Sequence, residues 1–462
     1  MAGGGQGAQG GTYPKRKGIG VVLLPLFCLH IPTLSRGGPD LGSHTLHSAP
    51  HAMPPEVEGE AAPPHPPDQP PSSTTHATTT LPLHADCAAF CPHHPWAALL
   101  AAGGYQLDEA TRTRAGLVQL YDTRGHSLRP AGPAWTGAGV LDVGWRPTTS
   151  SSRPTLAPPH VALALADGTV SLLGVDGRGS SGACEGWLEE EAAAVASGPL
   201  TLRPLAPALP VAAAPGGSAL ALALAWRDAT TLAASTSAGE LAVARVGEGG
   251  ALSLVGEPWN AHALEAWCVA WGGGGGGGEA AAALSTPAAG LLLSGADDAA
   301  LKGWDIREPP TTPSLTFSDA RTHGAGVTAI APSPAPGSHL IATGSYDEKA
   351  RLWDARAPGK PLLMATLPTG GGVWRLRWHP RDGTLILAAG MHAGFSILRV
   401  VDGGLSVAER YPHQATLAYG ADWCAAPPLR ARPGASLVAT ASFYDNLVHL
   451  WEPVTQSSIG KL

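Results

Sequence analysis

The stretches LLLSGADDAALKGWD (291–305) and LIATGSYDEKARLWD (340–354) decide the fold of this chain, because both describe the same small unit. In each, a run of apolar and small residues leads into an acidic turn, and a second run ends in Trp-Asp. Two short apolar runs around a tight polar turn are typical of a β-hairpin. Each stretch therefore predicts two antiparallel strands, and their likeness indicates an internal repeat.

The same unit recurs after residue 77. A first strand that ends in an aromatic residue and a turn precedes most hairpins, as in EAWCVAWGG (265–273), GVWRLRWHP (372–380) and YGADWCAAP (419–427), whereas GVTAIAPSP (326–334) is a copy that lacks the aromatic. Aligned in this way, the chain holds seven units, at 84–124, 136–176, 211–247, 259–307, 321–356, 369–401 and 413–453. Self-similarity of this kind predicts a repeat architecture.

The repeated pieces resemble WD repeats, whose name-giving dipeptide stands at Trp304-Asp305 and Trp353-Asp354. The resemblance implies four-stranded blades around a channel. We therefore expect an all-β fold, a seven-bladed WD-repeat β-propeller over residues 78–453, with a disordered N-terminal extension and a short tail at 454–462. The last unit stops after its third strand, so TTTLPLH (78–84) would supply the fourth and close the ring.

Composition agrees with many short strands joined by turns, since the 462 residues include 60 glycines and 44 prolines. The net charge of -7 argues against nucleic-acid binding, which needs a basic face. The six cysteines are too dilute for a disulfide framework and fit reduced thiols in an intracellular protein. Cys87 and Cys91 lie beside His93 and His94 with a spacing that permits a metal, but the same residues fit a strand entering a loop. We expect no metal and no cofactor.

Residues 1–77 form a separate, low-complexity segment. Basic residues followed by an apolar run in KRKGIGVVLLPLFCLHIPTL (15–34) resemble a targeting segment. Pro25 and Pro32 argue against a membrane span, and the proline-rich tract that follows is too polar to pack. The segment is expected to be disordered, and an import signal, a plain tail and an incorrect start exon all remain open.

Some polar residues of the repeats have an expected structural role. In WD-type blades, an aspartate in the turn between the second and third strands is held by a histidine that precedes the first strand. Buried polar groups need such partners. The turn residues here are Asp298, Asp347 and Asp445, and the expected partners are His262, His323 and His413.

The sixth unit departs from this pattern. Aligned with the corresponding stretch of the fifth unit, AAGMHAGFSILR (388–399) places His392 against Asp347, and PTGGG (368–372) offers no histidine before the first strand. The pairing that explains the other turn residues is therefore missing. His392 is either an ordinary exposed turn residue or a functional one.

Aromatic residues are predicted to gather at one mouth of the channel, because the turns after second strands and the loops before first strands emerge on the same face. Trp267, Trp374 and Tyr419 hold equivalent first-strand positions, Tyr346 and Tyr444 lie beside turn aspartates, and Tyr105 lies in the matching turn of the first unit. Glu265 and Asp422 flank these strands. Taken singly, each aromatic could be core. A group of them near carboxylates suits a cationic, poorly hydrated ligand such as a quaternary ammonium.

GGVWRLRWHP (371–380), LILAAGMHAGFSIL (385–398) and ATASFYDNLVHLWE (439–452) go beyond a general WD consensus. With them, the chain resembles the WD-repeat diphthine methylesterase family, also described as diphthine methyltransferase homologues, over about residues 78–453. The resemblance implies a cytoplasmic carboxylic ester hydrolase. It would hydrolyse the methyl ester of diphthine methyl ester on elongation factor 2, whose modified histidine carries a trimethylammonium group, before the last amidation of diphthamide biosynthesis. Elongation factor 2 is then the partner, with no nucleic acid, no membrane and a monomeric enzyme.

The chain contains no Gly-x-Ser-x-Gly elbow, so a serine nucleophile has no support. We expect His392 to act as general base on a water that attacks the ester carbonyl, with Asp445 or Glu265 orienting its ring. The ammonium group would be held by Trp267, Trp374, Tyr346, Tyr419, Tyr444 and Tyr105. The alternatives are a non-catalytic scaffold that binds a partner protein on this face, or a reader of methylated peptides.

Overall fold

The computed structural model describes residues 73–148, 158–177, 198–212, 219–272, 290–306, 313–357, 359–411, 416–425 and 436–454. Contacts divide the chain into Met1–Ala62 and Pro63–Leu462, and every described residue belongs to the second unit. Nearly all of its regular structure is strand, with short 3-10 helices at Trp96–Ala98 and Glu248–Gly250. Within the described ranges, no helix has the length and apolar character needed to cross a membrane.

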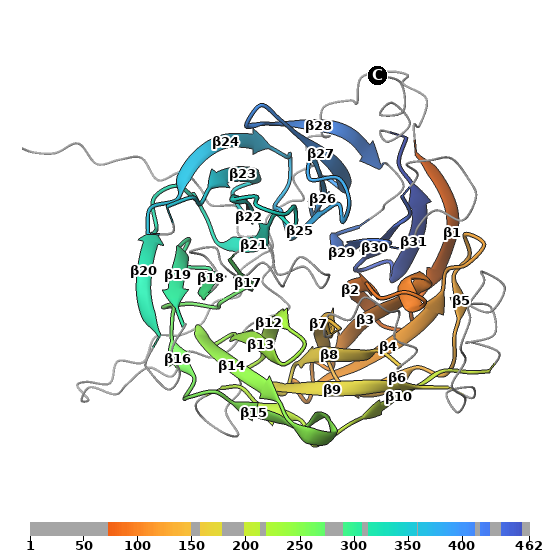
Figure 1. Cartoon of the computed structure of the whole chain (residues 1–462). Coiled ribbons are helices and arrows are strands. Elements are labelled where there is room, and N and C mark those ends of the chain that lie inside the picture. The colour runs from red at the N-terminus through yellow and green to blue at the C-terminus, as the bar shows by residue number, and fades with distance from the viewer. Residues whose placement is uncertain are drawn as a thin grey trace, which may run out of the picture. The chain divides into compact units, whose positions relative to one another are not determined.

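The strands form seven antiparallel sheets, which Figure 1 shows as blades around a common centre. Blade 1 comprises β2 (His84–Phe90), β3 (Leu99–Leu107), β4 (Arg114–Asp122), β5 (Arg129–Pro130) and β6 (Trp135–Ala138). Blade 2 comprises β7 (Val140–Trp145), β8 (His160–Leu165), β9 (Thr169–Asp176), β10 (Thr201–Pro204) and β11 (Leu209–Pro210). Blade 3 comprises β12 (Ala221–Asp228), β13 (Thr231–Thr236), β14 (Glu240–Val246), β15 (Leu252–Leu254) and β16 (Trp259–Asn260).

The remaining blades are four-stranded. Blade 4 comprises β17 (Cys268–Trp271), β18 (Leu291–Gly295), β19 (Leu301–Asp305) and β20 (Ser314–Asp319). Blade 5 comprises β21 (Val327–Pro332), β22 (Leu340–Ser345), β23 (Lys349–Asp354) and β24 (Leu362–Pro368). Blade 6 comprises β25 (Arg375–Trp378), β26 (Leu385–Ala389), β27 (Phe395–Val401) and β28 (Gly404–Tyr411). Blade 7 comprises β29 (Ala418–Trp423), β30 (Val438–Ser442), β31 (Leu447–Glu452) and β1 (Thr74–Thr80).

The ring is closed by β1, which pairs antiparallel with β31. Closure by the start of the propeller is as predicted, but the strand begins at Thr74 rather than at 78, so the expected boundary is corrected. The reason is local. The threonine-rich run suits an extended strand, whereas Pro82 has no N–H to continue the ladder.

The core lies between neighbouring blades and explains the aromatic residue at the end of most first strands. In five blades its indole Nε1 donates to a backbone carbonyl of the preceding blade's first strand at 2.7–3.0 Å: Trp145 to Ala89, Trp226 to Gly144, Trp271 to Ala225, Trp378 to Ala331, and Trp423 to Arg377. A buried indole N–H needs such a partner. The repeated tryptophan therefore both packs and fixes the contact between adjacent blades.

The predicted histidine–aspartate pair is confirmed in blade 4. His262 Nδ1 lies 3.1 Å from both carboxylate oxygens of Asp298, and its Nε2 lies 2.7 Å from Ser294 Oγ. Trp304 Nε1 donates to the same hydroxyl at 2.9 Å. Burial lowers the pKa of His262 to about 4, although the Asp298 charge acts in the opposite direction. The histidine is therefore neutral and structural.

The corresponding prediction for blade 5 is wrong. His323 Nε2 contacts Thr343 Oγ1 at 3.0 Å, but Asp347 accepts from Arg351 through both carboxylate oxygens, with Nη1 to Oδ1 at 3.0 Å, and its Oδ2 also accepts from the Gly324 N–H at 2.8 Å. The guanidinium of Arg351, four residues after Asp347, can form two hydrogen bonds to a carboxylate at once, and a neutral imidazole cannot. In blade 7, His413 lies outside the described residues.

Candidate functional site at the propeller mouth

The aromatic residues predicted for the mouth form one continuous cluster. The ring of Trp267 lies 6.1 Å from Tyr346 and 5.6 Å from Trp374, and Tyr346 and Trp374 are 6.1 Å apart. Trp374 in turn stacks on Tyr419 at 4.7 Å. These rings come from blades 4, 5, 6 and 7, so residues far apart in the sequence share one wall.

Phe443 joins the other predicted aromatics to this wall. Its ring lies 5.0 Å from Tyr419, 5.0 Å from Tyr444 and 5.5 Å from Tyr105 of blade 1. His84 packs on it at 4.8 Å. The sequence prediction missed Phe443 and His84, although the SFYD stretch that contains Phe443 was part of the distinguishing pattern. We define the aromatic cluster as Trp267, Tyr346, Trp374, Tyr419, Phe443, Tyr444 and Tyr105.

Exposure divides the cluster into a face and a support. Tyr444 is 50% exposed, and Trp267, Tyr346, Trp374 and Tyr419 are partly exposed. Phe443 is 1% exposed and Tyr105 only 5%. Tyr105 therefore supports the accessible rings from the blade 1 side, whereas the sequence prediction gave it direct contact with the ligand.

The first-strand spacing accounts for the position of three rings. Trp267 immediately precedes β17, Trp374 immediately precedes β25, and Tyr419 is the second residue of β29. These are among the innermost strands around the centre in Figure 1. Residues at this position lie where each first strand begins, at the mouth of the propeller. Equal spacing in the sequence therefore brings them together.

Asp297 supplies a negative charge at the cluster. Trp267 Nε1 donates to its Oδ1 at 3.2 Å, and its own N–H donates to the backbone carbonyl of Glu265 at 2.9 Å. A Cβ on Gly326 would lie 2.5 Å from Asp297 Oδ1 and 3.1 Å from Tyr346, so glycine is needed for this close approach. Asp297 is exposed. It therefore takes the place at the aromatic rings that the sequence prediction gave to Glu265, which is half-buried and contributes its backbone.

His392 lies in an exposed turn beside this wall. The neighbouring Met391 pairs with Ala418, which precedes Tyr419, and a Cβ on Gly372 would lie 2.8 Å from Met391 Sδ. The His392 side chain itself is exposed and makes no hydrogen bond, ion pair or ring contact with any described residue. Neither Asp445 nor Glu265 contacts it, so the expectation that one of them orients the ring has no contact behind it.

The two other expected carboxylates have different surroundings. Asp445 Oδ2 is buried without a hydrogen-bond partner in the described part of the chain, while its Oδ1 accepts from the Leu447 N–H at 3.4 Å. Asp422 does not face the mouth as expected, because its Oδ2 accepts from the Phe90 N–H of blade 1 at 2.7 Å. Burial raises the pKa of Asp422, with Arg377 opposing that effect. Asp422 thus joins blades 7 and 1.

A second set of charged residues lies on the innermost strands. Arg375 of blade 6 reaches Asp142 of blade 2, with Nη1 to Oδ1 at 3.0 Å, and Asp142 Oδ2 accepts from the Leu224 N–H at 3.1 Å. Asp86 of blade 1 is 3% exposed. Burial raises the pKa of Asp86 to about 8, Arg375 partly offsets this rise, and Asp142 adds to it. The sequence prediction missed these groups, although Asp86 precedes Phe90 by the interval that separates Trp267 from Trp271.

The cysteine–histidine stretch of blade 1 serves the fold. Cys87 and Cys91 are buried, and His93 Nε2 lies 2.7 Å from the backbone carbonyl of Arg146. Burial raises the pKa of Cys91 to about 12, which keeps the thiol protonated. Over the described ranges, no three histidine, cysteine, aspartate or glutamate side chains are placed to hold a metal ion.

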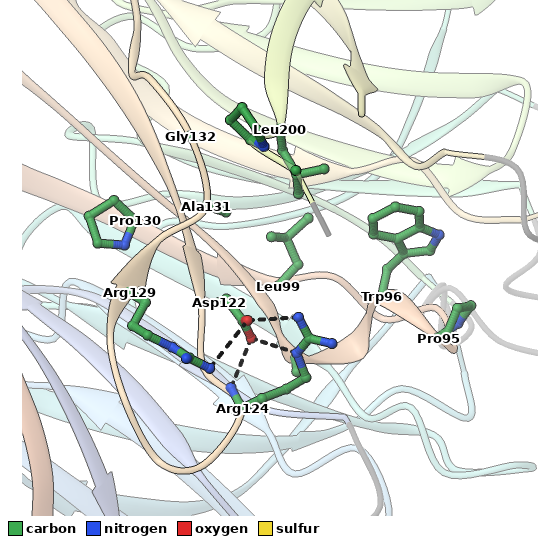
Figure 2. A pocket seen from close by; sticks show the side chains of 13 residues that line it. Pro95, Trp96, Leu99, Asp122, Arg124, Arg129, Pro130, Ala131, Gly132 and Leu200 are labelled. Atoms are coloured by element: carbon green, nitrogen blue, oxygen red, sulfur yellow. Dashed lines mark hydrogen bonds and ion pairs between the residues drawn. The ribbon is translucent and has the colours of Figure 1, made fainter. Parts of the chain in front are cut away.

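A separate pocket of about 460 Å³ lies at the outer part of blade 1, where the segment before β10 passes it. Figure 2 shows Asp122 between Arg124 and Arg129, with Trp96 and Leu200 on the apolar side. Arg124 Nε donates to Asp122 Oδ1 at 2.9 Å, and its Nη2 lies 2.8 Å from Oδ2. Burial acts to raise the pKa of Asp122, but Arg124 lowers it overall. None of the predicted site residues lines this pocket.

The chain is similar in sequence and in fold to known proteins. The model of the WD domain, G-beta repeat, matches residues 312–354. A chain in the crystal structure of the mitotic checkpoint complex superposes with a TM-score of 0.54 at 18% identity, covering 87% of this chain and 98% of that one. This likeness shows the propeller fold alone.

Sequence relatives are more specific. Diphthine methyltransferase of Mus musculus is 32% identical over 372 residues, which cover 74% of this chain and 67% of the relative. Diphthine methyltransferase of Schizosaccharomyces pombe is 30% identical over 362 residues, which cover 77% of this chain and 91% of the relative. The matches thus span most of the propeller. At this identity and coverage, the chain belongs to the diphthine methyltransferase family.

Proposed function

We propose that this chain hydrolyses the methyl ester of diphthine methyl ester on elongation factor 2, giving diphthine for the last amidation step of diphthamide biosynthesis. The observation that carries the proposal is the aromatic cluster with Asp297 at its edge. Membership of a family whose relatives are named diphthine methyltransferase supports the choice of substrate.

The chemistry of the cluster fits the substrate's trimethylammonium group. That group has no N–H to donate, so it is recognised by the negative faces of aromatic rings and by nearby carboxylates. Trp267, Tyr346 and Trp374 lie within about 6 Å of one another by their ring centroids, and Asp297 accepts from Trp267 beside them. The cluster thereby offers both kinds of contact in one place.

In the proposed reaction, His392 accepts a proton from a water that attacks the ester carbonyl. The carbonyl carbon gains the water oxygen, the bond to the methoxy group breaks, and methanol leaves with a proton. His392 is exposed and lies one residue from Met391, whose backbone pairs with the strand that carries Tyr419. A neutral imidazole near pH 7 suits this role. The carboxylates Asp445 and Glu265 have no part in the step as proposed.

Mass spectrometry of elongation factor 2 carrying the methylated diphthine tests the proposal. Incubation with the protein should remove the mass of one CH2 from the modified histidine. His392→Ala and His392→Gln, shown to be folded by circular dichroism, should abolish this loss. His94→Ala is the matched control, because His94 is exposed in the loop between the first and second strands of blade 1 rather than in a turn after a second strand. Full activity of the His392 variants would refute the general-base role.

The same experiment separates the enzyme from a non-catalytic propeller. Binding of the modified factor without any change of mass would identify a scaffold or a reader of methylated peptides. In that case the aromatic cluster is a recognition surface and no chemistry follows. The proposed esterase activity would then be wrong, while the cation-binding role of the cluster would stand.

A further inference from the structure

We propose that Arg375 and Asp86 bind the carboxyl or ester end of the ligand whose ammonium group is held by the aromatic cluster. The site would then recognise betaine-type groups, in which a quaternary ammonium and a carboxyl lie a few bonds apart. The inference deepens the proposed function and rests on it for the assignment of the cluster as the ligand site.

Arg375 is placed for this role by the strand that carries the cluster. It follows Trp374 directly and is the first residue of β25, one of the innermost strands in Figure 1. Its side chain is 15% exposed and spans from blade 6 to Asp142 of blade 2. The described residues supply a hydrogen-bond partner for its Nη1 but for no other guanidinium nitrogen. A guanidinium has five N–H donors, so most of them remain for a ligand.

Asp142 holds Arg375 in place through one of its guanidinium nitrogens and leaves the others available. Both carboxylate oxygens of Asp142 are engaged, one by Arg375 and the other by the Leu224 N–H. A carboxylate fixed in this way cannot swing to form a bidentate pair with the guanidinium. Arg375 is therefore anchored at one nitrogen and presents the others, which is the arrangement that favours binding of a second carboxyl group.

Asp86 holds the first-strand position at which blades 4, 6 and 7 carry Trp267, Trp374 and Tyr419. A bulge in the pairing of β2 falls between Ala85 and Cys87, as one in β29 falls between Ala418 and Gly420 around Tyr419. Asp86 and Tyr419 are thus equivalent residues of adjacent blades. The carboxyl of Asp86 is almost fully buried, and no hydrogen bond reaches it from the described residues. A carboxyl that makes no hydrogen bond to the described residues is available to a ligand that reaches it.

The protonation of Asp86 decides what it offers to the ligand. Burial raises its pKa to about 8, with Arg375 lowering and Asp142 raising it further, and Cys87 lies next to it in the chain. At neutral pH its carboxyl therefore carries a proton and can donate an O–H. A neutral ester carbonyl would accept from Asp86 and Arg375, and the carboxylate product would gain the charge of Arg375.

The cluster itself supplies a further donor without a partner. Trp374 Nε1 is buried and has no hydrogen-bond partner in the described ranges. Trp374 and Arg375 are consecutive in the chain, and Asp86 lies within electrostatic reach of Arg375. A ligand with a quaternary ammonium alone would leave these donors unsatisfied, whereas a betaine would use both parts of the site.

Calorimetric titration of the full chain with two small probes tests the inference. Glycine betaine carries both groups, and tetramethylammonium carries the cation alone. The wild-type protein should bind glycine betaine about tenfold more tightly, the value of one charge-assisted hydrogen-bond set. Arg375→Gln should abolish this preference and leave the affinity for tetramethylammonium unchanged. Arg375→Lys should retain part of the preference, and Asp86→Leu should reduce it.

Arg245→Gln serves as the matched control, since Arg245 is exposed on β14 of blade 3. Equal affinity of the wild-type protein for both probes, or no binding of either at millimolar concentration, would overturn the inference. So would an Arg375→Gln variant, folded by circular dichroism, that loses both probes to the same extent.

The ester assay on elongation factor 2 keeps this inference distinct from the proposed function. If the wild-type protein hydrolyses the ester but shows no preference for glycine betaine, only the roles of Arg375 and Asp86 are refuted. A clear betaine preference in a protein that never hydrolyses the ester refutes the esterase and leaves the binding site intact.

Discussion

The indole of Trp374 stacks on the ring of Tyr419 at 4.7 Å with 24° between their planes. The two residues hold the same first-strand position in blades 6 and 7, so each blade contributes one half of the stacked pair. Neither half can be placed without the packing between the blades. The proposed ligand binding at the mouth therefore depends on the relative position of these two blades as well as on the side chains themselves.

Trp374→Leu should weaken the binding of tetramethylammonium roughly threefold to thirtyfold, the range expected for loss of one cation–π contact. The substitution also removes the stacking partner of Tyr419, which leaves that ring free to move. Titration calorimetry with the folded variant measures the effect. Trp135→Leu, on an outer strand of blade 1, is the control. Unchanged affinity in Trp374→Leu would show that the cation binds elsewhere.

Asp297→Asn should weaken the binding of the same cation about threefold at low salt, because an exposed carboxylate contributes a modest, screened attraction. The amide can still accept from Trp267 Nε1, so the ring is expected to keep its position. The difference between wild type and variant should shrink as ionic strength rises. Asp176→Asn at an exposed position of blade 2 should have no effect at any salt concentration.

The protein should lose stability on acidification between about pH 6.5 and 4. Burial lowers the pKa of His262, His323 and His379 to about 4. Unfolded histidines take up a proton near 6.5 while the folded ones stay neutral, so protonation favours unfolding across this window. Each histidine contributes up to about 1.4 kcal/mol per pH unit. Urea denaturation at pH 7 and pH 5 measures the loss, and His379→Gln should reduce it. Equal stability at both values would contradict the neutral, buried state of these rings.

Asp86 should make the protein less stable as the pH rises, which is opposite to the effect of the histidines. Its pKa rises from 3.8 to about 8 on burial, so the unfolded chain releases the proton first and stability falls as pH rises from about 4 to 8. Asp86→Asn removes this titration. Urea midpoints measure the stability of the variant and the wild type. The variant should be more stable relative to the wild type at pH 8 than it is at pH 5. A difference that does not change with pH would mean that Asp86 is ionised in the folded protein.

Removal of β1 should open the ring. A chain that begins at residue 82 lacks the strand that pairs with β31 from Thr74 to Thr80. The edge of blade 7 would then expose unpaired N–H and C=O groups, which lowers the melting temperature and favours aggregation. A chain that begins at residue 73 keeps every described strand pair and is the control. Equal melting temperatures for the two would show that blade 7 is stable with three strands.

Much of the fold could be predicted because it repeats. Equal spacing from a common aromatic placed Trp267, Trp374 and Tyr419 together, since every blade enters the ring in the same way. Interactions that depend on a competing or distant partner could not be predicted. Asp347 follows the repeat in sequence, yet Arg351 displaces its expected histidine.

The contacts across the propeller could not be predicted from the sequence for a different reason. The pairing of Arg375 with Asp142 joins blades that are not neighbours, so no local pattern marks it. The position of Asp86 could have been read from its interval to Phe90, but its lack of a hydrogen-bond partner is a property of the folded interior. Asp297, beside the predicted turn residue Asp298, is distinguished only by the glycine that lets it approach Tyr346.

The closure of blade 7 has a consequence for how the protein is made. His76 of β1 lies 3.3 Å from Glu452 of β31, and 376 positions separate them in the chain. On the ribosome, β1 must wait unpaired while all the other blades are synthesised, because its partner strand emerges last. The aromatic cluster draws on blades 4 to 7 and on blade 1, so it too is assembled at that final moment. A nascent chain interrupted before β31 would contain every residue of the aromatic cluster but not the strand pair that closes the propeller.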